Sequence, residues 1–193
     1  QERSSEPASL LVLPGHAEQA PLMELILGMA KPVIAAINGV AVGAGATVPV
    51  TCDLRTAAES ARFSFAFAKR GLTPEYGSTF LLPRLVGWGK AKELCMTGRF
   101  VGAQEAKEIG LVNEVYPDGQ FMDSTRQLAR SIAANPPIAV RFIKRGMNMA
   151  LDSSLKHVVA FEQWALDTCR NSEDFKEGVR AFLDKRPARF EGR

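Results

Sequence analysis

The stretch from residue 33 to residue 46 constrains the fold more than any other part of the chain. Residues 33–37 are apolar and precede Asn38-Gly39, which is the pattern of a short buried strand that ends in a turn. The next seven residues read VAVGAGA and carry only small or β-branched side chains. A backbone with such small side chains can approach another element or a ligand closely. We therefore expect a strand and turn that lead into a short helix over residues 47–52, with Pro49 in its first turn.

Two interpretations of Gly43, Ala44 and Gly45 follow from this placement. The N-terminus of a helix exposes backbone N–H groups and a positive partial charge, and small side chains would let an anion or an oxyanion reach them. Alternatively, the small residues only allow a helix and a strand to pack closely, without any ligand. Spacing alone leaves both open. The segment is not a dinucleotide-binding fingerprint, because Val48 stands where the third glycine would be.

A second candidate site is the segment GLTPEYGS, which contains Glu75. If Thr73 caps a helix with Pro74 at its first position, Glu75 is a surface residue that stabilises the helix N-terminus. If apolar neighbours such as Phe67 and Tyr76 surround it, the carboxylate is instead a candidate general base. The residues by themselves leave both interpretations open.

Strand and helix patterns alternate in the first two thirds of the chain. Strands are expected over residues 54–57, 62–67 and 111–116, and in the second of these the phenylalanines recur with a period of two. Helices are expected over residues 90–97 and 103–109, with a break at Pro83. After residue 121 only helical patterns appear. This order predicts an α/β core followed by a helical region. We divide the chain into a polar segment with an entry helix (1–30), a core (31–120) and a helical region (121–193).

Composition excludes several other classes of protein. Hydrophobic residues make up 46% and charged residues 23% of the 193-residue chain, the balance of a folded globular protein rather than a disordered one. The net charge of +3 does not favour a nucleic-acid or membrane partner. Three widely spaced cysteines form neither a disulfide framework nor a zinc motif, and His16 and His157 have no partners at metal spacing. We expect no metal. With no leader pattern at the start given and no Ser-Lys-Leu end, we expect a cytoplasmic protein.

Several ordered motifs resemble those of the crotonase (enoyl-CoA hydratase/isomerase) superfamily. They are KPVIAAINGVAVGAG from residue 31, CDLRTA from residue 52, PRLVG from residue 83, GLVNEV from residue 110 and the stretch from Glu177-Gly178 to Phe182-Leu183. The resemblance runs from about residue 21 to the C-terminus. It implies an α/β fold with a ββα spiral core and an α-helical C-terminal trimerisation region, and hence a homotrimer or a dimer of trimers.

The resemblance also implies an acyl-coenzyme-A thioester as substrate. Members of the family hold the thioester enolate in an oxyanion hole of two backbone N–H groups, and such donors are worth about 3 kcal/mol each. By position, one donor is the amide of Ala44, between Gly43 and Gly45. No metal or redox cofactor is implied, since coenzyme A arrives as part of the substrate. A motif like Ala-Gly-Ala-Asp, which supplies the other donor in the family, is not recognisable in residues 1–13, so we expect the opening strands of the fold to be missing from this chain.

The catalytic carboxylates distinguish members of the family. Hydratases carry two glutamates, and the matching positions here hold Thr47 and Phe67. Glu75 instead matches the single catalytic glutamate of the Δ3,Δ2-enoyl-CoA isomerases. The resemblance therefore favours a 3-enoyl to 2-enoyl isomerase, in which Glu75 carries the proton from C2 to C4. The alternatives are other enolate chemistry on an acyl-CoA, such as isomerisation of a ring-derived thioester or hydration, and a non-catalytic acyl-CoA-binding scaffold.

We expect a small set of residues to contact the substrate. Gly43 and Gly45 flank the oxyanion donor, Phe67 offers an apolar wall, and Tyr76 adjoins Glu75. Lys185 begins a basic run that is ordinarily a solvated face but has the charge to meet a phosphate.

Overall fold

The computed structural model describes residues 19–193 of the chain. The polar start, the apolar run at residues 10–13 and His16 lie outside the described residues. Within residues 19–193, no helix is long and apolar enough to cross a membrane.

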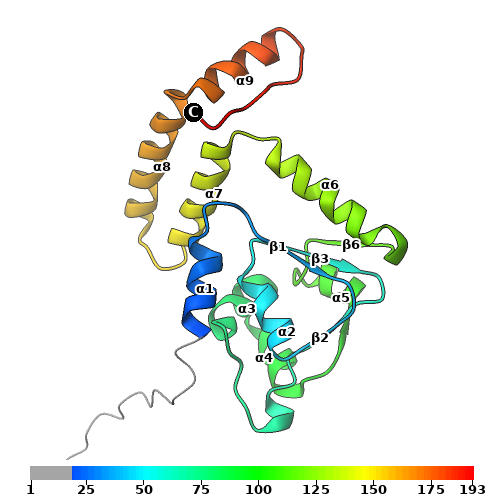
Figure 1. Cartoon of the computed structure of the whole chain (residues 1–193). Coiled ribbons are helices and arrows are strands. Elements are labelled where there is room, and N and C mark those ends of the chain that lie inside the picture. The colour runs from blue at the N-terminus through cyan, green and yellow to red at the C-terminus, as the bar shows by residue number, and fades with distance from the viewer. Residues whose placement is uncertain (1–18) are drawn as a thin grey trace, which may run out of the picture.

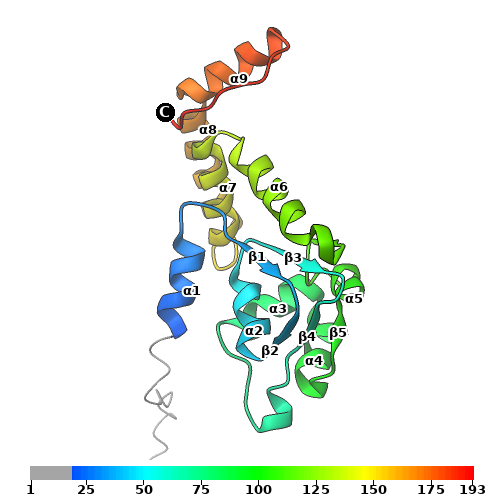
Figure 2. The same ribbon diagram turned by 45° about the vertical axis from the view of Figure 1, so that its right-hand side comes forward.

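The core contains two small sheets, which Figures 1 and 2 show from two directions. In the first, β1 (Ile34–Ile37), β3 (Leu54–Ala58) and β6 (Glu114–Tyr116) are parallel and lie in the order β1-β3-β6. In the second, β4 (Arg62–Ser64) lies between β2 (Val40–Val42), with which it is parallel, and β5 (Val101–Gly102), with which it is antiparallel. β1 therefore pairs with β3 in the first sheet, and β2 pairs with β4 in the second.

Short helices precede, connect and follow these strands. They are α1 (Gln19–Gly28), α2 (Ala44–Thr47), α3 (Ser78–Val86), α4 (Trp88–Thr97) and α5 (Ala103–Glu108), with 3₁₀ turns η2 (Val48–Thr51), η3 (Ala68–Arg70) and η4 (Asp118–Gln120). Phe65, Leu82 and Leu94 are among the large side chains buried between the sheets and helices. An α/β core precedes an all-helical region, as the sequence predicts.

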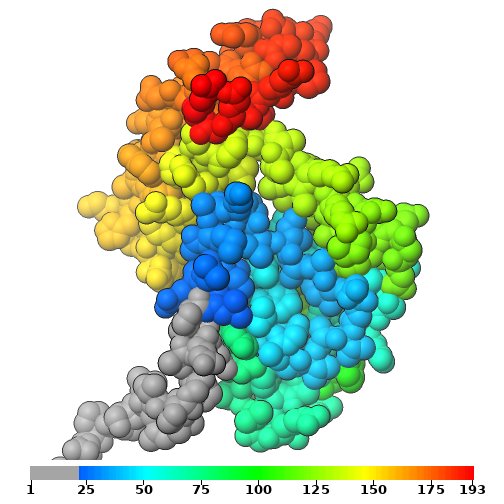
Figure 3. Space-filling model, viewed as in Figure 1, coloured from blue at the N-terminus to red at the C-terminus, as the bar shows by residue number. Residues whose placement is uncertain are grey.

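The C-terminal region consists of α6 (Phe121–Ala133), α7 (Pro137–Met149), α8 (Leu155–Arg170) and α9 (Glu173–Leu183). In Figure 3, α7, α8 and α9 form an elongated lobe that projects from the core, whereas α6 packs against β1, β3 and β6. Phe142, Phe161 and Trp164 join α7 to α8 through ring contacts with centroids 5.0 to 6.1 Å apart.

Several predicted boundaries are wrong. The strand expected over 62–67 ends at Ser64, because the N–H of Phe67 donates to the carbonyl of Phe65 (2.9 Å) and turns the chain. The strand expected over 111–116 is confined to Glu114–Tyr116, because the preceding amides donate to the carbonyl of Ala106 at the end of α5. Pro83 does not break α3; the helix continues past it, and the Gly87 amide donates to the Pro83 carbonyl (3.0 Å).

Candidate active site

Gly43 joins the end of β2 to the start of α2. Its N–H donates to the carbonyl of Ser64 (3.1 Å), which continues the pairing of β2 with β4, and its own carbonyl accepts from Ala46 (2.9 Å) and Thr47 (3.0 Å). The helix begins at Ala44, earlier than the sequence predicts. The amides of Ala44 and Gly45 are the first two of this helix, and no carbonyl of α2 lies in position to accept from them. Both residues are exposed.

The structure separates the two interpretations of this segment. A Cβ added to Gly43 or to Gly45 would meet no atom of residues 19–193 within 4 Å, so close packing of a helix on a strand does not require glycine there. What requires glycine at position 43 is the backbone, with φ 57° and ψ −123°, a conformation that residues with a side chain rarely adopt. The geometry therefore favours the interpretation in which the small residues leave room beside the first amides of α2.

Glu75 does not lie in a helix. α3 begins at Ser78 with Gly77 as its N-cap residue, so the interpretation in which Thr73 and Pro74 begin a helix is wrong. The physical reason is the backbone between Glu75 and Ser78. Tyr76 (φ 53°) and Gly77 (φ 67°) both have left-handed backbones, and a right-handed helix cannot continue through two such residues. Glu75 is half-buried on the turn that leads into α3.

Hydrogen bonds and packing hold this turn on both sides. The carbonyl of Glu75 accepts from the amide of Ser78 (3.1 Å) and from its hydroxyl (2.7 Å). The sulfur of Met23, from α1, occupies the place that a Cβ on Gly77 would take. Sequence analysis missed Ser78 and Met23. A serine three residues after Glu75 is a local pattern from which a hydrogen bond to the Glu75 carbonyl could have been predicted. Nothing in the sequence indicates that Met23 contacts the turn.

The Glu75 turn and the Ala44 amide come from neighbouring segments. α3, which follows the turn, packs against η2, which directly continues α2. Figures 1 and 2 show α2 and α3 next to each other from both directions. A carboxylate and exposed backbone donors are the groups needed to move a proton next to a carbonyl and to stabilise the resulting oxyanion.

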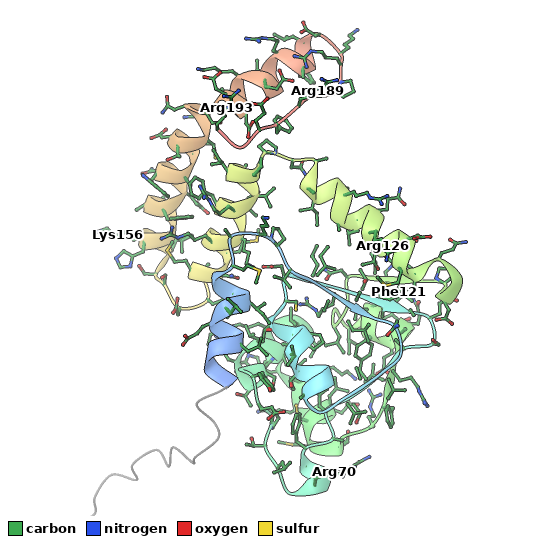
Figure 4. The ribbon with its side chains drawn as sticks, in the orientation of Figure 1. Arg70, Phe121, Arg126, Lys156, Arg189 and Arg193 are labelled. Atoms are coloured by element: carbon green, nitrogen blue, oxygen red, sulfur yellow. The ribbon has the colours of Figure 1, made fainter. Side chains whose placement is uncertain are left out.

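The other predicted site residues differ in their placement. Tyr76 is half-buried beside Glu75, whereas Phe67 is 7% exposed and packs in the hydrophobic core with Phe63 and Phe65. Within one chain the structure does not bring Lys185 to these residues. It is exposed and follows α9, at the end of the molecule away from α2, and Figure 4 shows the same separation between Arg70, the last residue of η3, and Arg189.

The two positions that the resemblance matches to the glutamates of hydratases hold no carboxylate. Thr47 is fully buried, and its hydroxyl donates back to the carbonyls of Gly43 (3.3 Å) and Ala44 (3.4 Å). Phe67 occupies the other position. Burial raises the pKa of the Cys52 thiol, at the end of η2, so this side chain stays protonated and does not supply a thiolate. Among residues 19–193, no three His, Cys, Asp or Glu side chains are grouped as metal ligands.

Comparison with known proteins gives a consistent match. The family model described as enoyl-CoA hydratase/isomerase matches residues 15–193. A short-chain-enoyl-CoA hydratase of Clostridium acetobutylicum is 40% identical over 156 residues, which are 81% of this chain and 60% of that protein. A 1,2-epoxyphenylacetyl-CoA isomerase of Escherichia coli is 40% identical over 173 residues, which are 90% of this chain and 66% of that protein. The chain thus spans about two thirds of the length of these relatives.

Solved structures agree on the fold. The crystal structure of an enoyl-CoA hydratase from Bacillus anthracis superposes with a TM-score of 0.88 at 39% identity, covering 92% of this chain and 69% of that one. A probable enoyl-CoA hydratase/isomerase from Mycobacterium abscessus gives the same TM-score at 32% identity, with the same coverage.

Proposed function

Because the chain belongs to the enoyl-CoA hydratase/isomerase family, we propose that it moves the double bond of an enoyl-CoA thioester from the 3-enoyl to the 2-enoyl position. The observation that carries this proposal is the placement of Glu75. It lies on a held turn before α3, next to the segment with the exposed amide of Ala44, and no carboxylate accompanies it at position 47 or 67. One carboxylate suffices for a 1,3-proton shift.

The reaction has two proton transfers. The Glu75 carboxylate removes a proton from C2 of the 3-enoyl thioester, and the electron pair spreads over the dienolate, whose oxygen accepts a hydrogen bond from the Ala44 N–H. The Glu75 carboxylic acid then returns the proton at C4, which leaves the double bond between C2 and C3. The Ala44 N–H stabilises the negative charge that develops on the thioester oxygen during the reaction. This hydrogen bond therefore lowers the free energy of the transition state more than that of the bound substrate.

A second candidate is the isomerisation of a ring-derived thioester. The 40% identity to the Escherichia coli 1,2-epoxyphenylacetyl-CoA isomerase supports it, over 90% of this chain. Hydration, the activity named for the relative from Clostridium acetobutylicum, fits the residues less well, because Thr47 and Phe67 can neither donate nor accept a proton in place of two glutamates.

The test is turnover of a 3-enoyl-CoA by the wild type and by Glu75→Gln, which keeps the shape of the side chain and removes the base. We expect kcat to fall about 100-fold or more, since general base catalysis contributes about 10² to 10⁴. Glu59→Gln is the matched control: Glu59 is an exposed glutamate after β3, and its loss should leave kcat within about twofold.

Each other outcome points to a different conclusion. Undiminished activity in Glu75→Gln removes Glu75 from the mechanism. Conversion of a 2-enoyl-CoA to a 3-hydroxyacyl-CoA, without isomerisation, assigns the protein to the hydratases. Saturable coenzyme-A binding without any turnover favours the scaffold alternative.

A further inference from the structure

The turn that carries Glu75 is strained where a tyrosine adopts a left-handed backbone. Among residues 19–193, the non-glycine residues with positive φ are Tyr76 (φ 53°) and Lys185 (φ 52°), and Tyr76 is followed directly by Gly77, whose φ is also positive (67°). An aromatic residue is disfavoured in this region because its Cβ crowds the following carbonyl. Some other interaction therefore has to hold the Glu75–Tyr76 peptide in place.

Ser78 supplies that interaction. It is 1% exposed, and both its amide (3.1 Å) and its hydroxyl (2.7 Å) donate to the carbonyl of Glu75. The hydrogen bond from the backbone N–H is part of the helix cap, and any residue except proline at position 78 could form it. The hydrogen bond from the hydroxyl requires serine or threonine, so a single substitution can remove it.

The direction of the Glu75 side chain depends on this peptide. Relaxation of Tyr76 to negative φ would rotate the peptide between residues 75 and 76 and move the carbonyl away from Ser78. Because this rotation is about the N–Cα bond of Tyr76, it also moves Glu75, with its carboxylate, to a different position relative to α3. On the opposite side, the sulfur of Met23 lies against Gly77 and restricts movement of the turn toward α1.

We propose that Ser78 is a positioning residue for Glu75, because the Ser78 hydroxyl holds the Glu75 carbonyl and thereby aims the carboxylate at the substrate. This inference rests on the proposed function, in which Glu75 carries the proton. Ser78 touches no reacting atom; it acts through the backbone of Glu75.

The test compares Ser78→Ala with a matched serine. Ser172 also donates its hydroxyl to the carbonyl three residues before it, that of Cys169 (2.6 Å), and it lies between α8 and α9. It accepts in addition from the Phe175 amide (3.1 Å), so Ser172→Ala removes at least as many hydrogen bonds. Both variants are measured with the wild type and Glu75→Gln in the same 3-enoyl-CoA assay, and their melting temperatures are recorded.

We expect Ser78→Ala to lower kcat about tenfold or more and to leave KM nearly unchanged, because a misaimed base slows chemistry without weakening binding. Ser172→Ala should keep the kcat of the wild type even if it melts earlier. If the two variants have equal kcat, or if Ser78→Ala changes KM instead, Ser78 has only a structural role. If Glu75→Gln is as active as the wild type, the proposed function fails and this inference fails with it, so the two failures are distinguishable.

Discussion

At the level of single residues, a buried ion pair joins four parts of the molecule. Lys144 of α7 is 5% exposed along its side chain, and its ammonium group donates to Asp53 Oδ2 (2.8 Å) and to the carbonyls of Ile26 (2.8 Å) and Lys31 (3.2 Å). The same carboxylate oxygen accepts from the amide of Val33 (2.7 Å). The pair therefore holds the end of α1, the chain before β1 and the chain before β3 against the C-terminal lobe.

Removing the lysine should leave Asp53 charged and uncompensated. We expect Lys144→Met to lower the free energy of unfolding by about 3–5 kcal/mol, the range for breaking a buried pair. Lys107→Met is the control, because Lys107 pairs with Glu114 at a similar distance (2.6 Å) but is 41% exposed, and such surface pairs are worth about 0–1 kcal/mol. Urea unfolding of the two variants measures the difference. Equal losses would show that the buried pair contributes no more than the exposed one.

At the level of elements, α9 and the residues that follow it form a closed unit. Asp174, 3% exposed, accepts from the amides of Glu191 (2.7 Å) and Gly192 (2.9 Å), so the chain end folds back along the helix. Glu177 binds the guanidinium of Arg186 (2.6 and 2.9 Å) and the amide of Arg189 (3.0 Å). Figure 4 shows Arg189 and Arg193 alongside α9. Two carboxylates of one helix thus hold the C-terminal tail, defined as residues 186–193.

This tail should loosen in acid. The hydrogen bonds from Arg186 and Arg189 lower the pKa of Glu177 from 4.5 to about 2. Because the pKa is lower in the folded protein, the carboxylate contributes its full stabilisation above pH 4.5 and loses it as the pH falls toward 2. Amide hydrogen exchange of the tail, corrected for intrinsic rates, should therefore accelerate over this interval.

Glu177→Gln provides the comparison for the tail. We expect faster exchange in this variant than in the wild type at pH 6, and a smaller acceleration between pH 4.5 and pH 2, because the titrating carboxylate is absent. An acceleration of the same size in both proteins would show that Glu177 does not cause the effect.

At the scale of the whole molecule, the C-terminal lobe exposes large apolar side chains. Phe182 of α9 is 83% exposed, and the other exposed large apolar side chains of α8 and α9 are Leu155, Val159, Trp164, Leu166, Phe175, Val179 and Leu183. Apolar surface on this scale is typical of an interface. Together with the resemblance described for the C-terminal region, it leads us to expect a homotrimer or a dimer of trimers.

Sedimentation tests the expected assembly directly. We expect the wild type to sediment as a trimer or a larger multiple, and Phe182→Asp to shift it toward the monomer, because burying an unpaired carboxylate in an apolar contact is unfavourable. Met96→Asp is the control, since Met96 is 70% exposed on α4 of the core rather than on the C-terminal lobe. A wild type that sediments as a monomer at all concentrations would contradict the expectation.

Local signals explain which predictions hold. The order of strands and helices follows from hydrophobic periods and from breakers such as Gly39 and Gly110, and these act over a few residues. The short strand after Arg62 shows the limit of such signals. Phe63, Phe65 and Phe67 are all buried, but the chain turns after Ser64 and packs them into one core without an extended strand.

The sequence by itself determined the class of fold, the family resemblance and the two segments that carry Ala44 and Glu75. Glycine at position 43 is part of that information, because its backbone conformation is a local property that few other residues tolerate. Only the tertiary structure excluded the interpretation in which Glu75 lies in the first turn of a helix, since the left-handed backbone at Tyr76 and Gly77 keeps it out of α3. It alone also paired Asp53 with Lys144, 91 residues apart. Such contacts depend on how elements pack, and packing depends on side chains far apart in the sequence.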